Sequence, residues 1–134
     1  MNTMENVSRL EGEFITDFLK PDTLLVKWEG YCTVDNYQYG FLKGIALSTE
    51  KGIKKWIVDL SDIKVINPEN QRWTQEVLIK KMNYSGIARV AVINPLCPLA
   101  SSSIKHMYQE SMHLIKFVRM AFNSIEEAES WLEN

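Results

Sequence analysis

Hydrophobic and polar residues change their period several times along the chain, and each change predicts an element. Residues 13–20 (EFITDFLK) and 23–30 (TLLVKWEG) are short runs rich in β-branched and aromatic residues. Pro21 and Asp22 between them are a turn signal. The two runs are therefore predicted to pair as a β-hairpin.

The next segment has the spacing of a helix. Thr33 can cap a helix through about Thr49, because its apolar positions fall at i, i+3, i+7 and i+11, namely Val34, Tyr37, Phe41 and Ile45. Gly40 and Gly44 lie inside it, at a cost of about 1 kcal/mol each relative to alanine. A packing reason is expected, because small residues let a helix approach a sheet closely. Gly52 closes the helix.

The middle of the chain reads as a strand followed by a helix. Residues 54–61 (KKWIVDLS) are a mostly apolar run of strand length, typical of a central strand covered on both faces. Asn67 followed by Pro68 is a strong helix start, because proline at the first helical position loses no needed N–H. This helix is predicted to continue to about Tyr84, with Gly86 as its stop.

The last third repeats the alternation. Residues 87–93 (IARVAVI) predict a buried strand, and residues 94–98 a loop with two prolines before a helix near 100–115. Residues 117–122 (FVRMAF) predict the final strand. Ser124 then caps a last helix, with Glu127 three residues later completing a capping box.

The resulting order, β-β-α-β-α-β-α-β-α, predicts an α/β sandwich. Strands that alternate with helices give right-handed crossovers and a mostly parallel sheet, here of five strands with the first as antiparallel edge and about four helices. No linker or repeat interrupts the chain. Residues 1–10 are expected to be a flexible N-terminus and residues 11–134 a single domain.

Composition and charge exclude several classes of function. The chain of 134 residues has 15 basic and 17 acidic residues and a formal net charge of −2, without the basic stripe of a nucleic-acid binder. Its apolar runs are shorter than the ~20 residues of a membrane span. No signal peptide is visible, and Cys32 and Cys97 lie 65 positions apart in sequence, so we expect a cytoplasmic protein with reduced thiols.

Residues with catalytic potential do not form a constellation. His106 and His113 are separated by two helical turns, about 10.5 Å, which is too far for one zinc ion. Cys97 could have a lowered pKa at a helix start, but no neighbouring histidine can serve as its base. Neither an enzyme nor a metal or other cofactor is therefore expected.

Several motifs together resemble the STAS domain, the SpoIIAA-like fold of bacterial anti-sigma-factor antagonists, and most closely its divergent STAS/SEC14-like branch. They are VKWEGYCTVDNY (26–37), KKWIVDLSDI (54–63), PENQRW (68–73), ARVAVI (88–93) and FNSIEEAESWL (122–132). The resemblance covers nearly the whole chain from about residue 12.

The resemblance also implies a missing switch. In anti-sigma antagonists a strand ending in Asp-Leu-Ser leads to a turn whose serine is phosphorylated, and that charge releases a partner. Asp59, Leu60 and Ser61 match the strand end. Asn67 falls where the family has aspartate and Pro68 where it has the phosphorylated serine, followed by Glu69 and Asn70. Neither Pro68 nor Glu69 can accept phosphate.

Two hypotheses of function follow. By resemblance, the chain is a non-catalytic module that binds a protein partner through the turn and the second helix, at Ser61, Asp62, Asn67, Glu69, Asn70 and Trp73. The alternative is a small apolar ligand or lipid, held outside the carboxyl ends of the strands at Ser61, Ile66, Asn94, Cys97 and Ser101. A homodimer through the edge strand or an aromatic helix face is compatible with either hypothesis.

Overall fold

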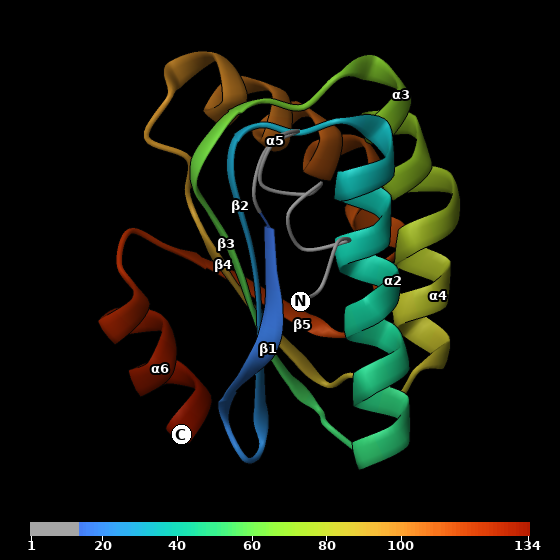
Figure 1. Cartoon of the computed structure of the whole chain (residues 1–134), viewed down its shortest axis with the longest axis vertical. Helices are drawn as coiled ribbons and strands as arrows, with labels where there is room; N and C mark the ends of the chain where they lie inside the picture. Colours follow the sequence, from blue (N-terminus) through green and yellow to red (C-terminus); the bar gives the residue numbers. More distant parts are fainter. Residues whose placement is uncertain (1–13) are drawn as a thin grey trace, which may run out of the picture.

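A computed structural model describes residues 14–134, which form one five-stranded sheet covered on both faces by helices (Figure 1). The strands are β1 (Phe14–Lys20), β2 (Thr23–Tyr31), β3 (Lys55–Val65), β4 (Arg89–Ile93) and β5 (Val118–Phe122). The helices are α2 (Val34–Lys51), α3 (Pro68–Trp73), α4 (Ile79–Tyr84), α5 (Pro98–Ser111) and α6 (Ile125–Glu133), with short helical turns at Thr74–Leu78 and Met112–Leu114.

The strands lie side by side in their sequence order, from β1 to β5. β1 pairs with β2 in antiparallel fashion, and every other neighbouring pair is parallel. Helices α2 to α5 cover one face of the sheet and α6 covers the other (Figure 1). The predicted α/β class, the antiparallel edge strand and the four helical segments are confirmed. The predicted division at residues 10 and 11 lies outside the described residues.

Helix α2 shows why its two glycines are needed. Its start is capped by the Thr33 hydroxyl, which accepts the N–H of Asn36, and it ends at Gly52 with a left-handed φ of 69°. A Cβ atom on Gly40 would lie 2.9 Å from the Trp28 ring, and one on Gly44 would lie 2.9 Å from the Trp56 ring. The predicted packing role is confirmed, because the glycines let α2 lie directly against these two indoles.

Strand β3 is longer than predicted. It was expected to end near Ser61, but it continues to Val65, and its pairing with β2 shifts between Lys27 and Glu29. This bulge changes which face each side chain takes: Leu60 lies in the main core, and so does Ile63 three residues later. The alternation of apolar and polar residues along a strand could not reveal this extension in the sequence, because the bulge interrupts the alternation.

The predicted helix from Asn67 to Tyr84 is one continuous helical segment, but its middle turn is wider than an α-helix. The Asn67 side chain caps its start by accepting the N–H of Asn70 at 2.8 Å. Residues Thr74–Leu78 form a π-helical turn. The Thr74 hydroxyl lies at 2.8 Å from both the Asn70 carbonyl oxygen and the buried Tyr37 hydroxyl, so two helices are joined at this turn.

The sheet separates two hydrophobic cores of unequal size. The larger core lies under α2 to α5 and contains the fully buried Trp28 and Trp56. The smaller core lies under α6 and joins Ile57, Ala91 and Ile93 of the sheet to α6. No helix among the described residues is long and apolar enough to cross a membrane.

Candidate functional site

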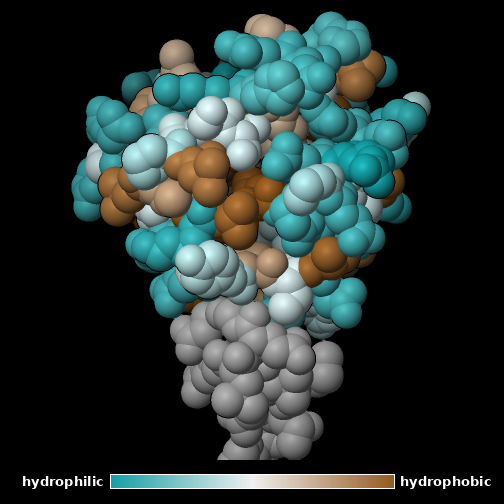
Figure 2. Space-filling model, turned by 90° about the horizontal axis from the view of Figure 1, so that it is seen from above, coloured by the Kyte–Doolittle hydropathy of each residue, from teal (hydrophilic) through white to brown (hydrophobic). Residues whose placement is uncertain are grey.

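The carboxyl ends of the parallel strands meet at the end of the molecule that is uppermost in Figure 1, where α3 begins and the β4–α5 connection lies. Figure 2 looks down on this end and shows hydrophobic side chains gathered near the centre of a mostly polar surface. In open α/β sheets this is the end where ligands and partners bind.

A charged cluster occupies the α6 side of strands β2 and β3. The Lys27 ammonium lies 3.2 Å from Asp62, 3.8 Å from Asp59 and 3.9 Å from Glu29. We call Lys27, Glu29, Asp59 and Asp62 the Lys27 cluster. One oxygen of Asp59 also accepts the N–H and the hydroxyl of Ser61, at 3.0 and 2.6 Å. Ser61 is therefore a strand residue whose side chain and N–H are both bonded to Asp59.

The Lys27 cluster changes the titration of its lysine. Partial burial lowers the pKa of Lys27 and is the largest single effect, but the hydrogen bond that Lys27 donates to Asp62 and the charges of Asp59, Asp62 and Glu29 together raise that pKa above its usual value. The ammonium is thus held in its charged form. This cluster can fix the bulge of β3, because it ties residues on both sides of the bulge to β2.

The start of α3 brings together only part of the predicted partner-binding residues. Asn67 and Glu69 lie at the first turn, where Glu69 is exposed and Asn67 is half-buried. Asn70 is only 1% exposed, and its side-chain oxygen accepts a hydrogen bond from Gln38 at 3.4 Å. Asn70 is therefore a link between α3 and α2, and we leave it out of any contact surface.

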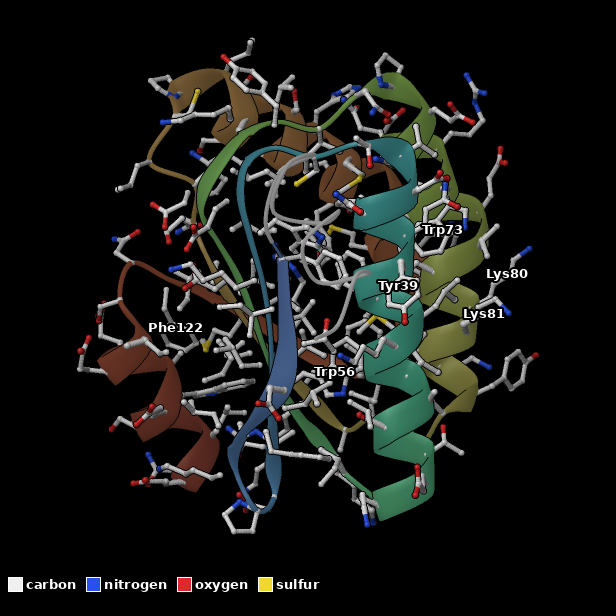
Figure 3. The ribbon with its side chains drawn as sticks, in the orientation of Figure 1. Tyr39, Trp56, Trp73, Lys80, Lys81 and Phe122 are labelled. Carbon is white, nitrogen blue, oxygen red and sulfur yellow. The ribbon has the colours of Figure 1, made fainter. Side chains whose placement is uncertain are left out.

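Three of the predicted contact residues, Ser61, Asp62 and Trp73, lie away from the first turn of α3. Trp73, labelled in Figure 3, is half-buried. Its ring packs beside those of Tyr37 and Phe41, at centroid distances of 6.1 and 6.3 Å. Ser61 and Asp62 lie four or more residues before the turn, which is more than about 13 Å along an extended strand. The six predicted residues thus do not form one compact face.

The β4–α5 connection and the first turn of α5 contribute apolar residues that sequence reasoning missed. Its backbone is tied to β3 by the Leu96 N–H, which donates to the Ser61 carbonyl oxygen at 3.1 Å. Leu96 and Leu99 are 78% and 65% exposed, although leucine is usually buried. In the sequence, Leu96 lies between Pro95 and Pro98 in the predicted loop, whereas Leu99 lies between that loop and the helix predicted near 100–115, and neither was singled out as a candidate.

The two cysteines differ in environment. The Cys97 thiol lies at the start of α5, where the backbone N–H groups of Ala100 and Leu99 and, more weakly, the charge of Lys64 lower its pKa. Cys32 is packed against the main core, and burial raises its pKa to about 12. Both thiols are free of disulfides. The pKa of Cys97 is thus lowered at a helix start, as the sequence predicted.

This difference predicts selective alkylation. With limiting iodoacetamide at pH 7, we expect Cys97 to react at least about tenfold faster than Cys32, because the thiolate is the nucleophile. Peptide mass spectrometry of timed samples measures both rates in the same molecule, so Cys32 is the internal control. Equal rates would show that the helix start does not stabilise the Cys97 thiolate.

The predicted ligand-binding residues line neither of the two best-defined hollows found among residues 14–134. Ile66 is buried, and Asn94 donates a side-chain hydrogen bond to Asn123 at 3.0 Å. Ser101 donates its N–H to the Cys97 carbonyl oxygen within α5. One of these hollows, of about 210 Å³, is lined by Lys20, Asp22, Thr23, Lys55, Glu129, Leu132 and Glu133, and the other by residues 18–21 and Lys51.

The remaining candidates for chemistry are dispersed. His106 is exposed and lies 3.2 Å from Glu110, one turn along α5, and His113 is exposed in the following turn. No group of three or more histidine, cysteine, aspartate or glutamate side chains in the described part of the chain is arranged to hold a metal ion.

These features define a class of fold, an α/β sandwich built on a five-stranded sheet. The turn that leads from β3 into α3 lies at the carboxyl end of the parallel strands. The solved structure of the anti-sigma factor antagonist SpoIIAA in its unphosphorylated form is similar, with a TM-score of 0.64 over 90% of this chain and 98% of that chain at 11% identity. An anti-sigma factor antagonist from Mycobacterium paratuberculosis matches with a TM-score of 0.60 over 92% and 95% of the two chains at 9% identity.

A third similar structure is an uncharacterised protein of the DUF3478 family with a SpoIIAA-like fold from Shewanella loihica PV-4. It matches with a TM-score of 0.58 over 90% of this chain and 93% of that chain, at 16% identity. No protein-family model matches the sequence, and neither does any curated protein. The chain therefore has the SpoIIAA-like fold, and at these identities the likeness concerns the fold alone.

Proposed function

We propose that the chain is a non-catalytic binding module that recognises a protein partner through the carboxyl end of its sheet. The contact surface comprises the start of α3, with Asn67 and Glu69, the exposed Leu96 of the β4–α5 connection and the exposed Leu99 in the first turn of α5. The observation that carries the proposal is the exposure of these two leucines at the carboxyl end of the sheet, away from both hollows described above.

Large exposed apolar side chains next to polar ones are typical of protein interfaces. Leu96 is held in place by the hydrogen bond of its N–H to Ser61, so its side chain is presented from a fixed backbone. The anti-sigma factor antagonists with this fold also support a protein partner, because proteins of that name act against another protein. A ligand or lipid would need a cavity at this end, and the two hollows described above lie elsewhere, so we place that alternative second.

The partner is expected to be bound without a phosphorylation switch at the α3 turn. Between Asp62 and Trp73 the chain contains no serine, threonine or tyrosine. Glu69 instead gives the first turn of α3 a constant negative charge, which favours a helix start. Incubation with a serine kinase of the host should leave residues 62–73 without phosphate in a peptide mass spectrum, and phosphate there would contradict the proposal.

The partner surface is tested by the double substitution Leu96→Ser and Leu99→Ser. We expect it to weaken retention of the partner by the tagged protein at least about tenfold, because two apolar anchors are lost. The matched control is Tyr84→Ser, which removes an equally exposed side chain from the end of α4. Isothermal titration with the recovered partner then gives the two dissociation constants.

The outcomes are distinct. Loss of binding in the leucine variant with full binding in the Tyr84 variant supports the proposed surface. Equal binding by both variants overturns it, since both variants change only exposed side chains and should remain folded. A small molecule that copurifies with the chain and leaves on denaturation, detected by native mass spectrometry, would favour the ligand alternative.

A further inference from the structure

The charged residues are distributed unevenly along the chain. Residues 77–125, which include α4, β4, α5 and β5, contain six basic residues and one acidic residue, although the whole chain has a formal net charge of −2. One of the six, Arg89, stacks on Trp131 on the α6 side of the sheet. The others belong to α4, α5 and β5 or to the turn before β5, so the fold decides which of them lie side by side.

Hydrogen bonds join the end of α4 to the connection between α5 and β5. The Asn83 side chain donates to the Leu114 carbonyl oxygen at 2.8 Å and accepts the Lys116 N–H at 2.9 Å. The Lys116 ammonium lies 6.0 Å from the centre of the Tyr84 ring. Lys80 lies one helical turn before Tyr84 and projects from α4 away from the sheet (Figure 3). Two of the basic residues therefore share one surface.

Arg119 extends this surface along the α5 side of β5. Its guanidinium carbon lies 3.2 Å from the centre of the Tyr108 ring, and its Nε atom is buried without a hydrogen-bond partner in the described part of the chain. Met112 follows Tyr108 by about one helical turn, so the two residues lie on the same flank of α5. We call the following residues the α4–β5 surface: Lys80, Tyr84, Met112, Leu114, Lys116 and Arg119.

The protein leaves the cations of the α4–β5 surface without ionic partners. Lys80, Lys116 and Arg119 form no ion pair within residues 14–134. Glu76 lies one helical turn before Lys80 at an exposed position, and Glu110, the acidic residue of the segment, is already bonded to a histidine and a glutamine. The surface therefore has more positive than negative charge and complements an anionic partner.

Large apolar side chains project among these cations. Tyr84, Met112 and Leu114 are 86%, 66% and 40% exposed. Tyrosine is enriched where proteins meet the interface between membrane and water, because its ring is apolar and its hydroxyl is polar. Lysine and arginine beside apolar side chains are typical of surfaces that lie on anionic lipid, with the apolar tips among the headgroups and the charged groups at the phosphates.

Two other kinds of anionic partner fit this surface less well. Single-stranded nucleic acid stacks its bases on free aromatic faces, but the Tyr108 ring is covered by Arg119 and the Lys116 ammonium lies beside the Tyr84 ring. An acidic protein would have to bury lysines, which are depleted at protein interfaces. Unpaired lysines next to exposed apolar side chains match an anionic lipid surface, where the lysines remain hydrated.

We infer that the α4–β5 surface binds peripherally to membranes that contain anionic lipid. Lys80, Lys116 and Arg119 then lie at the level of the lipid phosphates, and Met112 and Leu114 enter the headgroup region. The surface lies toward the amino ends of the parallel strands, because Leu114 and Lys116 precede β5. The proposed partner surface lies at the carboxyl ends, so the inference does not depend on the proposed function and both surfaces remain accessible at the same time.

Cosedimentation of the full chain with lipid vesicles tests the inference. We expect vesicles of phosphatidylcholine with about one-third phosphatidylglycerol to retain the chain, and vesicles of pure phosphatidylcholine not to retain it. Lys80→Gln with Lys116→Gln should weaken partitioning roughly 25-fold, because each lysine near such a surface contributes about fivefold. The matched control, Lys43→Gln with Lys64→Gln, removes the same charge from exposed positions of α2 and β3 and should bind within about twofold of the wild type.

The apolar contribution is tested by Met112→Ser with Leu114→Ser. We expect this pair to weaken partitioning about tenfold, because two apolar side chains leave the headgroup region. Ile15→Ser with Leu42→Ser removes side chains of 45% and 41% exposure from β1 and α2 and should have no effect. Circular dichroism verifies that each variant is folded, and fluorescence anisotropy with a labelled single-stranded oligonucleotide measures nucleic-acid binding by the same proteins.

No retention by anionic vesicles, or equal retention by both kinds of vesicle, overturns the inference. Equal effects of the two lysine pairs overturn it as well, because binding would then not depend on the α4–β5 surface. Binding of the oligonucleotide without binding of vesicles would assign the surface to nucleic acid instead. Equal binding by the two serine pairs would exclude the insertion of Met112 and Leu114. Should the serine variant fail to fold, the lysine pairs still decide.

Discussion

Gly44→Val is expected to lower the free energy of unfolding by about 3 kcal/mol, at the upper end of the usual cost of overpacking. A Cβ atom at this position would lie 2.9 Å from Cη2 of Trp56 and 3.0 Å from Cδ2 of Leu24. Neither side chain can move away easily, because both are fully buried and the Trp56 N–H is bonded to the Ser48 hydroxyl at 2.7 Å. Denaturant unfolding monitored by tryptophan fluorescence gives the value.

The matched control is Ala46→Val on the exposed side of α2. It adds a β-branched residue to the same helix without a clash, so we expect a loss of only about 0.5 kcal/mol from helix propensity. The large difference between the two variants would come from contact with the sheet. If Gly44→Val cost no more than Ala46→Val, then α2 would not lie against Trp56 as described.

Lys27→Met is expected to lower the free energy of unfolding by about 2 kcal/mol, because removing one partner of a partly buried ion cluster leaves the others uncompensated. The carboxylates of Asp59, Asp62 and Glu29 would then face one another without the ammonium. Methionine has nearly the same length, so packing changes little. Lys20→Met, whose ion pairs with Glu129 and Glu133 lie at the surface, is the control and should change stability little.

The contribution of Lys27 to the free energy of unfolding should be lost only at high pH. Its pKa is raised in the folded state, so its stabilising contribution is complete below the unfolded pKa, near 10.5, and is lost as the pH rises through the higher folded value. The difference between the wild type and Lys27→Met should therefore be constant from pH 7 to about 9 and narrow in strong alkali. A difference that narrowed between pH 7 and 9 would contradict this assignment.

Much of the fold could be predicted because its signals are local. The caps at Thr33, Asn67 and Ser124 were read directly from single residues, and each one accepts the predicted backbone N–H. The glycines of α2 indicated close packing before their partners were known. Such features depend on residues a few positions apart, so the sequence contains all the information that they require.

The predictions from sequence were wrong where contacts between residues far apart in the sequence override the local conformational preference. The end of β3 was misplaced because its bulge and its pairing with β2 extend the strand past Ser61. The π-helical turn was missed because it depends on the Tyr37 hydroxyl, 37 positions before Thr74. Asn70 was assigned to the surface from its place in a turn, although its neighbours in α2 bury it.

The composition and order of the elements thus determined the class of fold, the parallel sheet and the helix boundaries. Only the tertiary structure decided which side chains meet at the functional end. Lys27 reaches Asp59 because parallel strands place residues 32 positions apart in register, and Leu96 is presented outward because its backbone is tied to Ser61. These contacts depend on which strands are neighbours and in what register, and no local pattern of residues specifies either.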